Sequence, residues 1–321
     1  MLPEQTGPLI AIGFCTYRRP VGLARALEHI GGTVASLGRA VAVIVVDNDG
    51  ADPQIAQIVA QQSQVQGLEV HYVIESTPGI SAARNAVFAR ADALGVRHLA
   101  MLDDDEWPAP GWLPALLRRQ AETQAVVVGG PVEPVFPEAA ADMRRYARLW
   151  AVEPQLLDGK PFVFCTCNFL IDLSAIKDVQ RPLFESELGL SGSEDTVFFR
   201  SLFYRGFAMA WASDALLYEE VTSERATLTW LRRRRFAAGN HAVGWEARDR
   251  GRLRTFLKTL GMTGRLLIYP ALGREHEAPL IGWLLQWERV RGRYAAHSGK
   301  QFQGYARPVV AAGSPRLKSC R

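Results

Sequence analysis

The stretch Leu99-Ala100-Met101-Leu102-Asp103-Asp104-Asp105-Glu106-Trp107-Pro108 is the most informative in the chain, because an apolar run of strand length stops in four consecutive acids. In an extended strand alternate side chains share a face, so we expect Asp103 and Asp105 on one side and Asp104 on the other. Clustered carboxylates repel one another unless a positive charge neutralises them. A divalent cation would do so, since Mg²⁺-type ions take one or two protein carboxylates and complete their shell with phosphate oxygens. The alternative is an acidic surface turn in which Asp105 or Glu106 caps a helix over 112–120.

Strand-like and helix-like segments alternate before this cluster. The expected strands span 9–15, 40–46, 68–74 and 99–102, and the expected helices span 21–30, 53–62 and 81–94. This alternation predicts an α/β fold with a doubly wound, mostly parallel sheet, right-handed crossovers and flanking helices. Such sheets bind ligands beyond the carboxyl ends of their strands. The polar loops at Thr16, Asp47, Glu75 and Asp103 are all expected at that edge.

Two residues of these loops suit a nucleotide, although each also has a structural explanation. Asp47 could accept hydrogen bonds from a base or ribose, or could belong to an ordinary strand-to-helix turn. Arg84 lies one turn into its helix, near a helix N-terminus that favours anions, or could be a solvated helix arginine. The chain has neither GxGxxG nor GxxxxGK[ST], which argues against a dinucleotide-binding fold and a P-loop ATPase.

Four motifs in succession resemble the N-terminal half of a family 2 glycosyltransferase with the GT-A fold. They are Cys15-Thr16-Tyr17-Arg18-Arg19-Pro20, Val45-Val46-Asp47-Asn48, Pro78-Gly79-Ile80-Ser81-Ala82-Ala83-Arg84-Asn85 and Leu102-Asp103-Asp104-Asp105-Glu106, within about the first 110 residues. The resemblance implies an inverting transferase that uses a nucleotide-diphosphate sugar, expected to be a UDP-sugar, with Mn²⁺ or Mg²⁺. It further implies that Asp103 and Asp105 form a DxD motif in which Asp105 is the metal ligand. The residues implied in donor binding are Thr16, Arg18, Asp47, Arg84, Asp103 and Asp104.

The second half should supply the acceptor site and a catalytic base. Ser193 is expected to cap a helix with Glu194 and Asp195 in its first turn, where acids would also simply complement the helix dipole. The pair resembles the Glu-Asp pair of the family, which implies that Asp195 is the general base and Glu194 its support. Direct displacement at an anomeric carbon needs one carboxylate to take the proton of the acceptor hydroxyl on the face opposite the leaving diphosphate.

Three further segments resemble the family less closely. Asn168, on a strand expected over 163–173, resembles an Asn near the donor sugar, although cysteines stand where glycine is more usual. Glu220 could substitute for a metal-binding His that related enzymes often carry near this position. In residues 230–236 Arg232 fills the Gln position and Phe236 the Trp position of a QxxRW-like segment. Arg235 would then contact the diphosphate, unless the segment is a solvated basic helix face.

Composition sets the outer bounds of the interpretation. With 321 residues and 48% hydrophobic residues, the chain can bury a full core, and we expect one large domain with an appendage. We expect neither a cleaved signal nor a membrane-spanning helix. Four cysteines without CxxC spacing suggest a reducing cytoplasm, with Cys165 and Cys167 as core residues of a strand.

Positive charge gathers in the C-terminal third. Residues 225–321 hold 20 Lys+Arg against 5 Asp+Glu, so this part carries +15 and residues 1–224 carry −11. Such a balance suggests a polyanion, either nucleic acid or the anionic face of a membrane. From residue 253 onward, leucines and tryptophans alternate with basic residues, as in helices that lie in a membrane interface. A helical subdomain packed on the main body would explain the same pattern.

We therefore predict three parts: residues 1–110 as the nucleotide-sugar-binding half of a GT-A domain, 111–238 as its acceptor and catalytic-base half, and 239–321 as a basic, amphipathic helical extension. The expected partners are a sugar donor, a carbohydrate or lipid-linked acceptor in bacterial-type polysaccharide or glycolipid synthesis, and an anionic membrane touched peripherally, with no nucleic acid. The expected location is the cytoplasm or the inner face of the cell membrane. One alternative is a nucleotidyltransferase, although residues 16–20 lack its usual glycine-rich loop. Another is a non-catalytic polyanion-binding protein led by the run of arginines at 232–235.

Overall fold

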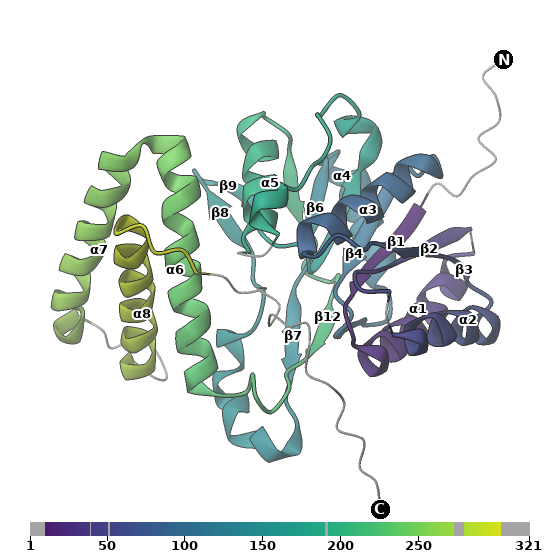
Figure 1. Ribbon diagram of the computed structural model, residues 1–321, viewed down its shortest axis with the longest axis horizontal. Helices are drawn as coiled ribbons and strands as arrows, with labels where there is room; N and C mark the ends of the chain where they lie inside the picture. Colours follow the sequence, from purple (N-terminus) through teal and green to yellow (C-terminus); the bar gives the residue numbers. More distant parts are fainter. Residues whose placement is uncertain (1–9, 39, 51, 190–191, 273–278, 303–321) are drawn as a thin grey trace, which may run out of the picture.

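The computed structural model of the chain describes residues 10–38, 40–50, 52–189, 192–272 and 279–302. Its main sheet has seven strands in the order β11-β6-β10-β4-β1-β2-β3 (Figure 1). The strands are β1 (Ile10–Thr16), β2 (Val41–Asp47), β3 (Glu69–Ile74), β4 (His98–Leu102), β6 (Val127–Gly129), β10 (Asn168–Asp172) and β11 (Met209–Trp211). β4, β1, β2 and β3 are mutually parallel, β11 is parallel to β6, and β10 runs antiparallel to both of its neighbours. The predicted mostly parallel sheet is confirmed.

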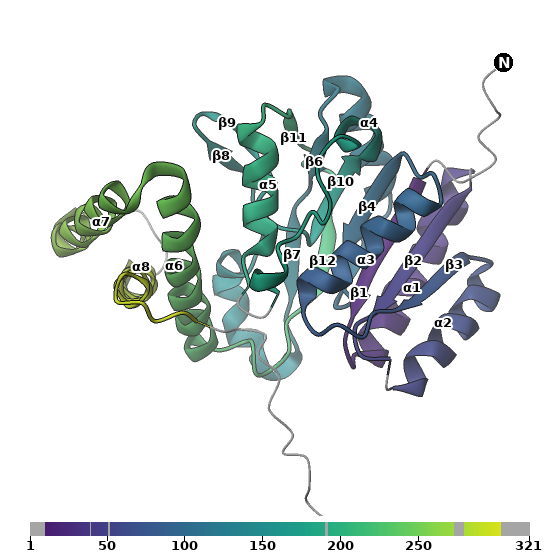
Figure 2. The same ribbon diagram turned by 45° about the horizontal axis from the view of Figure 1, so that its top comes forward.

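Helices cover both faces of this sheet, as continuous apolar strands require. One face carries α1 (Pro20–Leu37), α2 (Pro53–Gln66) and α4 (Trp112–Thr123), which bury residues such as Leu27 and Trp112 against it. The other carries α3 (Ile80–Ala93) and α5 (Glu194–Tyr204), through residues such as Phe88 and Phe199 (Figure 2). The two-sided core confirms the doubly wound architecture.

The segment after the acidic cluster builds a smaller sheet next to the first. β5 (Glu106–Pro108) pairs antiparallel with β12 (Leu217–Glu220), and β12 pairs parallel with β7 (Val132–Val135). Between β7 and β10 lie a 3₁₀ segment, η1 (Glu138–Leu149), and the short pair β8 (Gln155–Leu157) and β9 (Lys160–Phe162). The β5–β12 register places Glu219 opposite Glu106, so the small sheet delivers a further acid to the end of β4.

Three local expectations were wrong. Residues 163–167 are not a strand, because β10 begins only at Asn168. The cap position of α4 is held by Gly111 in a left-handed conformation (φ 84°), so neither Asp105 nor Glu106 caps that helix. Ser193 does stand at the cap of α5, but its side chain donates no capping bond. Its φ of 72° differs from the extended backbone that brings a capping hydroxyl onto the first turn.

The C-terminal part is an appendage of three long helices, as expected from the sequence. They are α6 (Leu228–Arg250), α7 (Arg252–Leu272) and α8 (Pro279–His297). Gly239 and Gly292 allow α6 and α8 to approach closely, because neither has a side chain at the contact. A Cβ on Gly239 would meet the Arg289 carbonyl oxygen at 1.9 Å, and one on Gly292 would meet the Phe236 carbonyl oxygen at 2.0 Å. The predicted boundary at 238/239 falls within α6, and the division into three parts stays a prediction. None of the described helices has the length and apolar composition to cross a bilayer.

Candidate active site

The carboxyl ends of β1, β2 and β4 meet at one edge, and the polar residues that follow them come together there. Thr16 is in register with Asp47, and the Asn48 amide donates to the Thr16 carbonyl at 2.9 Å. Asp47 is completely buried and accepts hydrogen bonds from the Tyr72 hydroxyl at 2.8 Å and the Asp49 amide at 3.0 Å. The loops predicted to surround a nucleotide therefore do share an edge of the sheet. Hydrogen bonds from Tyr72 and Asp49 fix the side chain of Asp47 there.

The acids after β4 form a turn and not an extended strand. Thr16 Oγ1 donates to Asp104 at 2.8 Å, and the Arg19 guanidinium bonds both Asp104 at 3.1 Å and Asp105 at 2.7 Å. Asp103 faces a different arginine, Arg84, at 3.9 Å. The predicted alternation of these side chains is wrong because β4 ends at Leu102. Burial raises the pKa of Asp104 to about 6 against the opposing charge of Arg19.

Glu219 and Arg225 complete the acidic cluster, and no motif in the sequence indicated a role for either residue. Arg225 donates to Asp105 at 2.9 Å and to Glu219 at 3.2 Å. Burial, reinforced by the charge of Asp105, raises the pKa of Glu219 to about 7. Glu220, the expected substitute ligand, instead pairs with Arg25. Because side chains alternate along β12, only one of the two adjacent glutamates can face the cluster.

A buried ion pair joins the two halves of the site. Arg84 of α3 and Glu194 of α5 are 6% and 3% exposed, and the guanidinium donates to the carboxylate. Burial raises the pKa of Glu194 to about 7, while Arg84 opposes the shift and Asp195 adds to it. Asp195 lies on the first turn of α5, where its Oδ1 accepts the Thr196 amide at 2.6 Å. The Arg84–Glu194 pair therefore links the turn that carries Asp195, the expected base, to the acids that follow β4.

Other predicted residues lie outside the acidic cluster. Arg18 is exposed and pairs with Asp49 at 2.7 Å. Arg235 is half-buried on α6, where burial and the charges of Arg234 and Arg289 lower its pKa. The charge of Arg234, the preceding residue, lowers the pKa of Glu219, so the arginine of α6 whose charge acts on the cluster is one residue earlier than expected.

Asn168 has a structural role in this fold. It is 1% exposed, its Oδ1 accepts the Trp112 indole N–H at 2.8 Å, and its Nδ2 donates to the carbonyls of Pro131 and Ala215 at 2.8 Å each. These bonds tie β10 to α4 and to the small sheet. Both amide protons are used, so the buried side chain has no donor left for a sugar hydroxyl.

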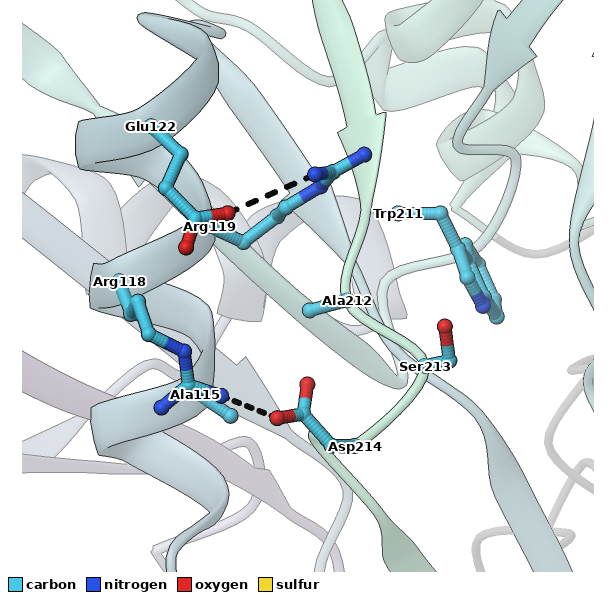
Figure 3. Close-up of a pocket in the computed structure, with 8 residues that line it drawn as sticks. All are labelled: Ala115, Arg118, Arg119, Glu122, Trp211, Ala212, Ser213 and Asp214. Atoms are coloured by element: carbon cyan, nitrogen blue, oxygen red, sulfur yellow. Dashed lines mark hydrogen bonds and ion pairs between the residues drawn. The ribbon is translucent and has the colours of Figure 1, made fainter.

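A pocket lined by residues of α4 and of the segment 211–214 does not contain these residues. It lies between α4 and the end of β11, and Figure 3 shows its arginines already paired, Arg118 with Asp214 and Arg119 with Glu122. The Trp211 ring points to the opposite side of the strand from both arginines. This surface offers neither a free cationic group nor an aromatic platform, so we do not place the site there.

The acidic cluster fits a divalent cation that is shared with a diphosphate. Carboxylate oxygens of Asp103, Asp105 and Glu219 are the hard donors that Mg²⁺ and Mn²⁺ take. No three His, Cys, Asp or Glu side chains in the described ranges are arranged as a ready-made metal cage. An ion held by one or two carboxylates completes its shell with phosphate oxygens and water, so such a cage is not required.

Comparison with known proteins agrees with this arrangement. The family model "Glycosyl transferase family 2" matches residues 12–180. The succinoglycan biosynthesis protein ExoM of Rhizobium meliloti (strain 1021) is 34% identical over 230 residues, 72% of either chain. The mannosyltransferase PcManGT from Pyrobaculum calidifontis, solved with GDP-Man and Mn²⁺, has a TM-score of 0.59 at 15% identity and covers 93% of this chain and 90% of its own. GalNAc-T7, solved with UDP, GalNAc and Mn²⁺, has a TM-score of 0.50 at 10% identity over 71% of this chain and 48% of its own.

The two kinds of likeness support different conclusions. At 10–15% identity the solved structures establish the GT-A fold alone. The family model and the relative establish membership, and they favour the transferase over a nucleotidyltransferase or a polyanion-binding protein. The chain belongs to the family 2 glycosyltransferases.

Proposed function

We propose that this glycosyltransferase moves a sugar, with inversion, from a UDP-sugar to a hydroxyl of a carbohydrate or lipid-linked acceptor, with Mn²⁺ or Mg²⁺. The observation that carries the proposal is the Arg84–Glu194 pair, which joins the first turn of α5 to the edge that bears the acidic cluster. The relative is named for succinoglycan biosynthesis, which supports an acceptor on the route to a bacterial surface polysaccharide. The two structural neighbours were solved with Mn²⁺, one with GDP-Man and one with UDP, so the identity of the nucleotide base in the donor needs its own test.

The acidic cluster would hold the leaving group. Asp105, Asp103 and Glu219 would hold the cation, which when bound stabilises the negative charge that grows on the departing diphosphate. Without donor, Arg19 and Arg225 supply the positive charge that Asp105 requires. Both guanidiniums are also suited to pair with diphosphate oxygens, because their planar fork matches phosphate geometry.

Asp195 would act as the general base. Its carboxylate removes the proton from the acceptor hydroxyl while that oxygen bonds to the anomeric carbon, and the bond between that carbon and the diphosphate oxygen breaks on the opposite face. Glu194 would act as a positioning residue, because its buried bond to Arg84 fixes the turn that carries Asp195. One displacement of this kind inverts the anomeric configuration.

Nucleotide release from a panel of UDP-sugars, with short glycan acceptors and Mn²⁺ or EDTA, tests the assignment. Asp195→Asn should lower kcat by about 10²- to 10⁴-fold and leave the affinity for UDP and Mn²⁺ unchanged. Asp178→Asn, at an exposed aspartate beside a 3₁₀ turn, is the matched control and should behave as wild type. Equal turnover by Asp195→Asn and the wild type would remove Asp195 from the mechanism.

A further inference from the structure

Helix α7 has an inverted distribution of polar and apolar side chains. Its inward face carries Thr255 and Thr259, which are 2% and 0% exposed. Thr259 Oγ1 accepts from Arg293 Nε at 2.8 Å and lies 3.1 Å from His297 Nε2, and Thr263 Oγ1 lies 2.9 Å from the Tyr294 hydroxyl. The helix therefore packs on α8 through hydroxyl contacts, although its sequence contains enough leucine to form an apolar interface.

The leucines of α7 face outward instead. Six large apolar side chains of α7 are exposed, and the first residue beyond Pro279 in α8 adds a seventh; they are Leu253, Phe256, Leu257, Leu260, Leu267, Ile268 and Leu280. Leu267 and Leu280 are 73% and 82% exposed. Spacings of three, four and seven residues place the α7 members on one stripe of the helix. We call this stripe of α7 the α7 face; exposed apolar patches of this kind mark interaction surfaces.

Charge accompanies the α7 face and is of one sign. Arg252, Arg254 and Arg265 are exposed, and in the described part of the chain they form no ion pair. Lys258 pairs with Glu246 of α6 at 2.6 Å. The sequence 250–272 contains no Asp or Glu. A partner for this surface must therefore be both apolar and anionic.

We propose that the α7 face binds the surface of an anionic lipid bilayer, with α7 lying in the plane of the interface. Apolar side chains that enter the acyl boundary while arginines reach the headgroups are the mark of interfacial helices. A second copy of the chain is the poorer partner, because a two-fold contact through this face would bring arginines together without acids to offset them. In Figures 1 and 2 α7 lies at the outer edge of the molecule, away from the main sheet, where a flat surface can reach it.

The inference is independent of the donor and the metal. It does, however, suit a lipid-linked acceptor, because α6 begins three residues after Arg225 of the acidic cluster and leads directly to α7. Binding at the α7 face would place the enzyme on the surface where lipid-linked acceptors are found.

Co-sedimentation of the full chain with vesicles tests the apolar part of the proposal. The wild type should bind vesicles of equal phosphatidylcholine and phosphatidylglycerol, more weakly as salt rises. Leu257→Gln/Leu267→Gln/Ile268→Gln should lower the partition coefficient by at least about tenfold. Val65→Gln/Leu156→Gln removes side chains that are 69% and 71% exposed elsewhere and should bind as wild type. Unchanged binding by the α7 variant, or no binding by the wild type, would overturn the proposal.

Charge reversal tests the electrostatic part. Arg252→Glu/Arg254→Glu/Arg265→Glu should lower binding to the anionic vesicles by at least about tenfold, while Lys160→Glu/Lys177→Glu, at exposed lysines of the main domain, should change it little. Circular dichroism confirms that each variant folds. Analytical ultracentrifugation tests whether the partner of the α7 face is instead a second copy of the chain. A concentration-dependent dimer that the α7 substitutions abolish, together with no vesicle binding by the wild type, would show that the face is a dimer interface.

Discussion

Substitution of Gly22 by alanine should lower activity by displacing the acidic turn that follows β4. Gly22 lies in α1, and a Cβ there would stand 2.5 Å from the Asp104 carbonyl oxygen and 3.8 Å from the Asp105 Cα. Side-chain Cβ atoms essentially never approach closer than 3.0 Å, so the acidic turn must move by at least about 0.5 Å. A displacement of about 1 Å can cost about 10²-fold in rate. We expect kcat/KM to fall about 10- to 10²-fold.

The effect of Gly22→Ala on stability should be smaller than its effect on activity. Overpacking costs about 1–3 kcal/mol, whereas replacing glycine by alanine within a helix gains about 1 kcal/mol. The free energy of unfolding in urea should therefore fall by about 0–2 kcal/mol. Gly32→Ala in the same helix is the control, because a Cβ there meets no atom within 4 Å, and it should be fully active. If Gly22→Ala were as active and as stable as Gly32→Ala, the packing of α1 on the acidic turn would be refuted.

Two further predictions concern the helical appendage and pH. Gly239→Ala should destabilise the protein to urea, because its Cβ would meet the Arg289 carbonyl at 1.9 Å, whereas Gly244→Ala, which meets nothing within 4 Å, should be neutral or stabilising. UDP affinity with Mn²⁺, measured by calorimetry, should rise between about pH 5 and pH 8, because Glu219, with a pKa of about 7, must ionise to hold a cation, and Asp104, with a pKa of about 6, then adds negative charge beside it. Both values lie above the 3.8 and 4.5 of the unfolded chain, so without metal the stability should fall as pH rises from about 4 to about 7, between the unfolded and the folded pKa values; a flat profile would contradict these assignments.

The parallel half of the fold was predictable because its rules are local. Apolar runs without alternation indicate strands buried on both faces, and the carboxyl ends of parallel strands meet at one edge. These two facts bring Thr16 to Asp47 and place the acids after Leu102 beside them, as the structure confirms. Only the resemblance pointed to a catalytic role for the Glu194-Asp195 turn, because acids at a helix N-terminus also simply complement the helix dipole.

The rest of the site depends on contacts distant in sequence. Glu219 reaches the cluster only because β12 pairs with β5, and the pattern around it does not reveal that partner. The Arg84–Glu194 pair joins residues 110 positions apart. The direction of the α7 leucines could not be inferred from periodicity, because a helix with threonines on one face and leucines on the other is expected to bury the leucines.

Calorimetric titration of UDP tests the central claim most directly, on wild type and Asp105→Asn, in Mn²⁺ and in EDTA. The account predicts binding by the wild type that requires Mn²⁺ and is lost in Asp105→Asn. Asp214→Asn, at the exposed aspartate of the pocket in Figure 3, should bind as wild type. Titration of GDP and dTDP under the same conditions tests which nucleotide base the site prefers. UDP binding that is equally tight in EDTA, or unchanged in Asp105→Asn, would contradict the metal-bound diphosphate site proposed at the end of β4.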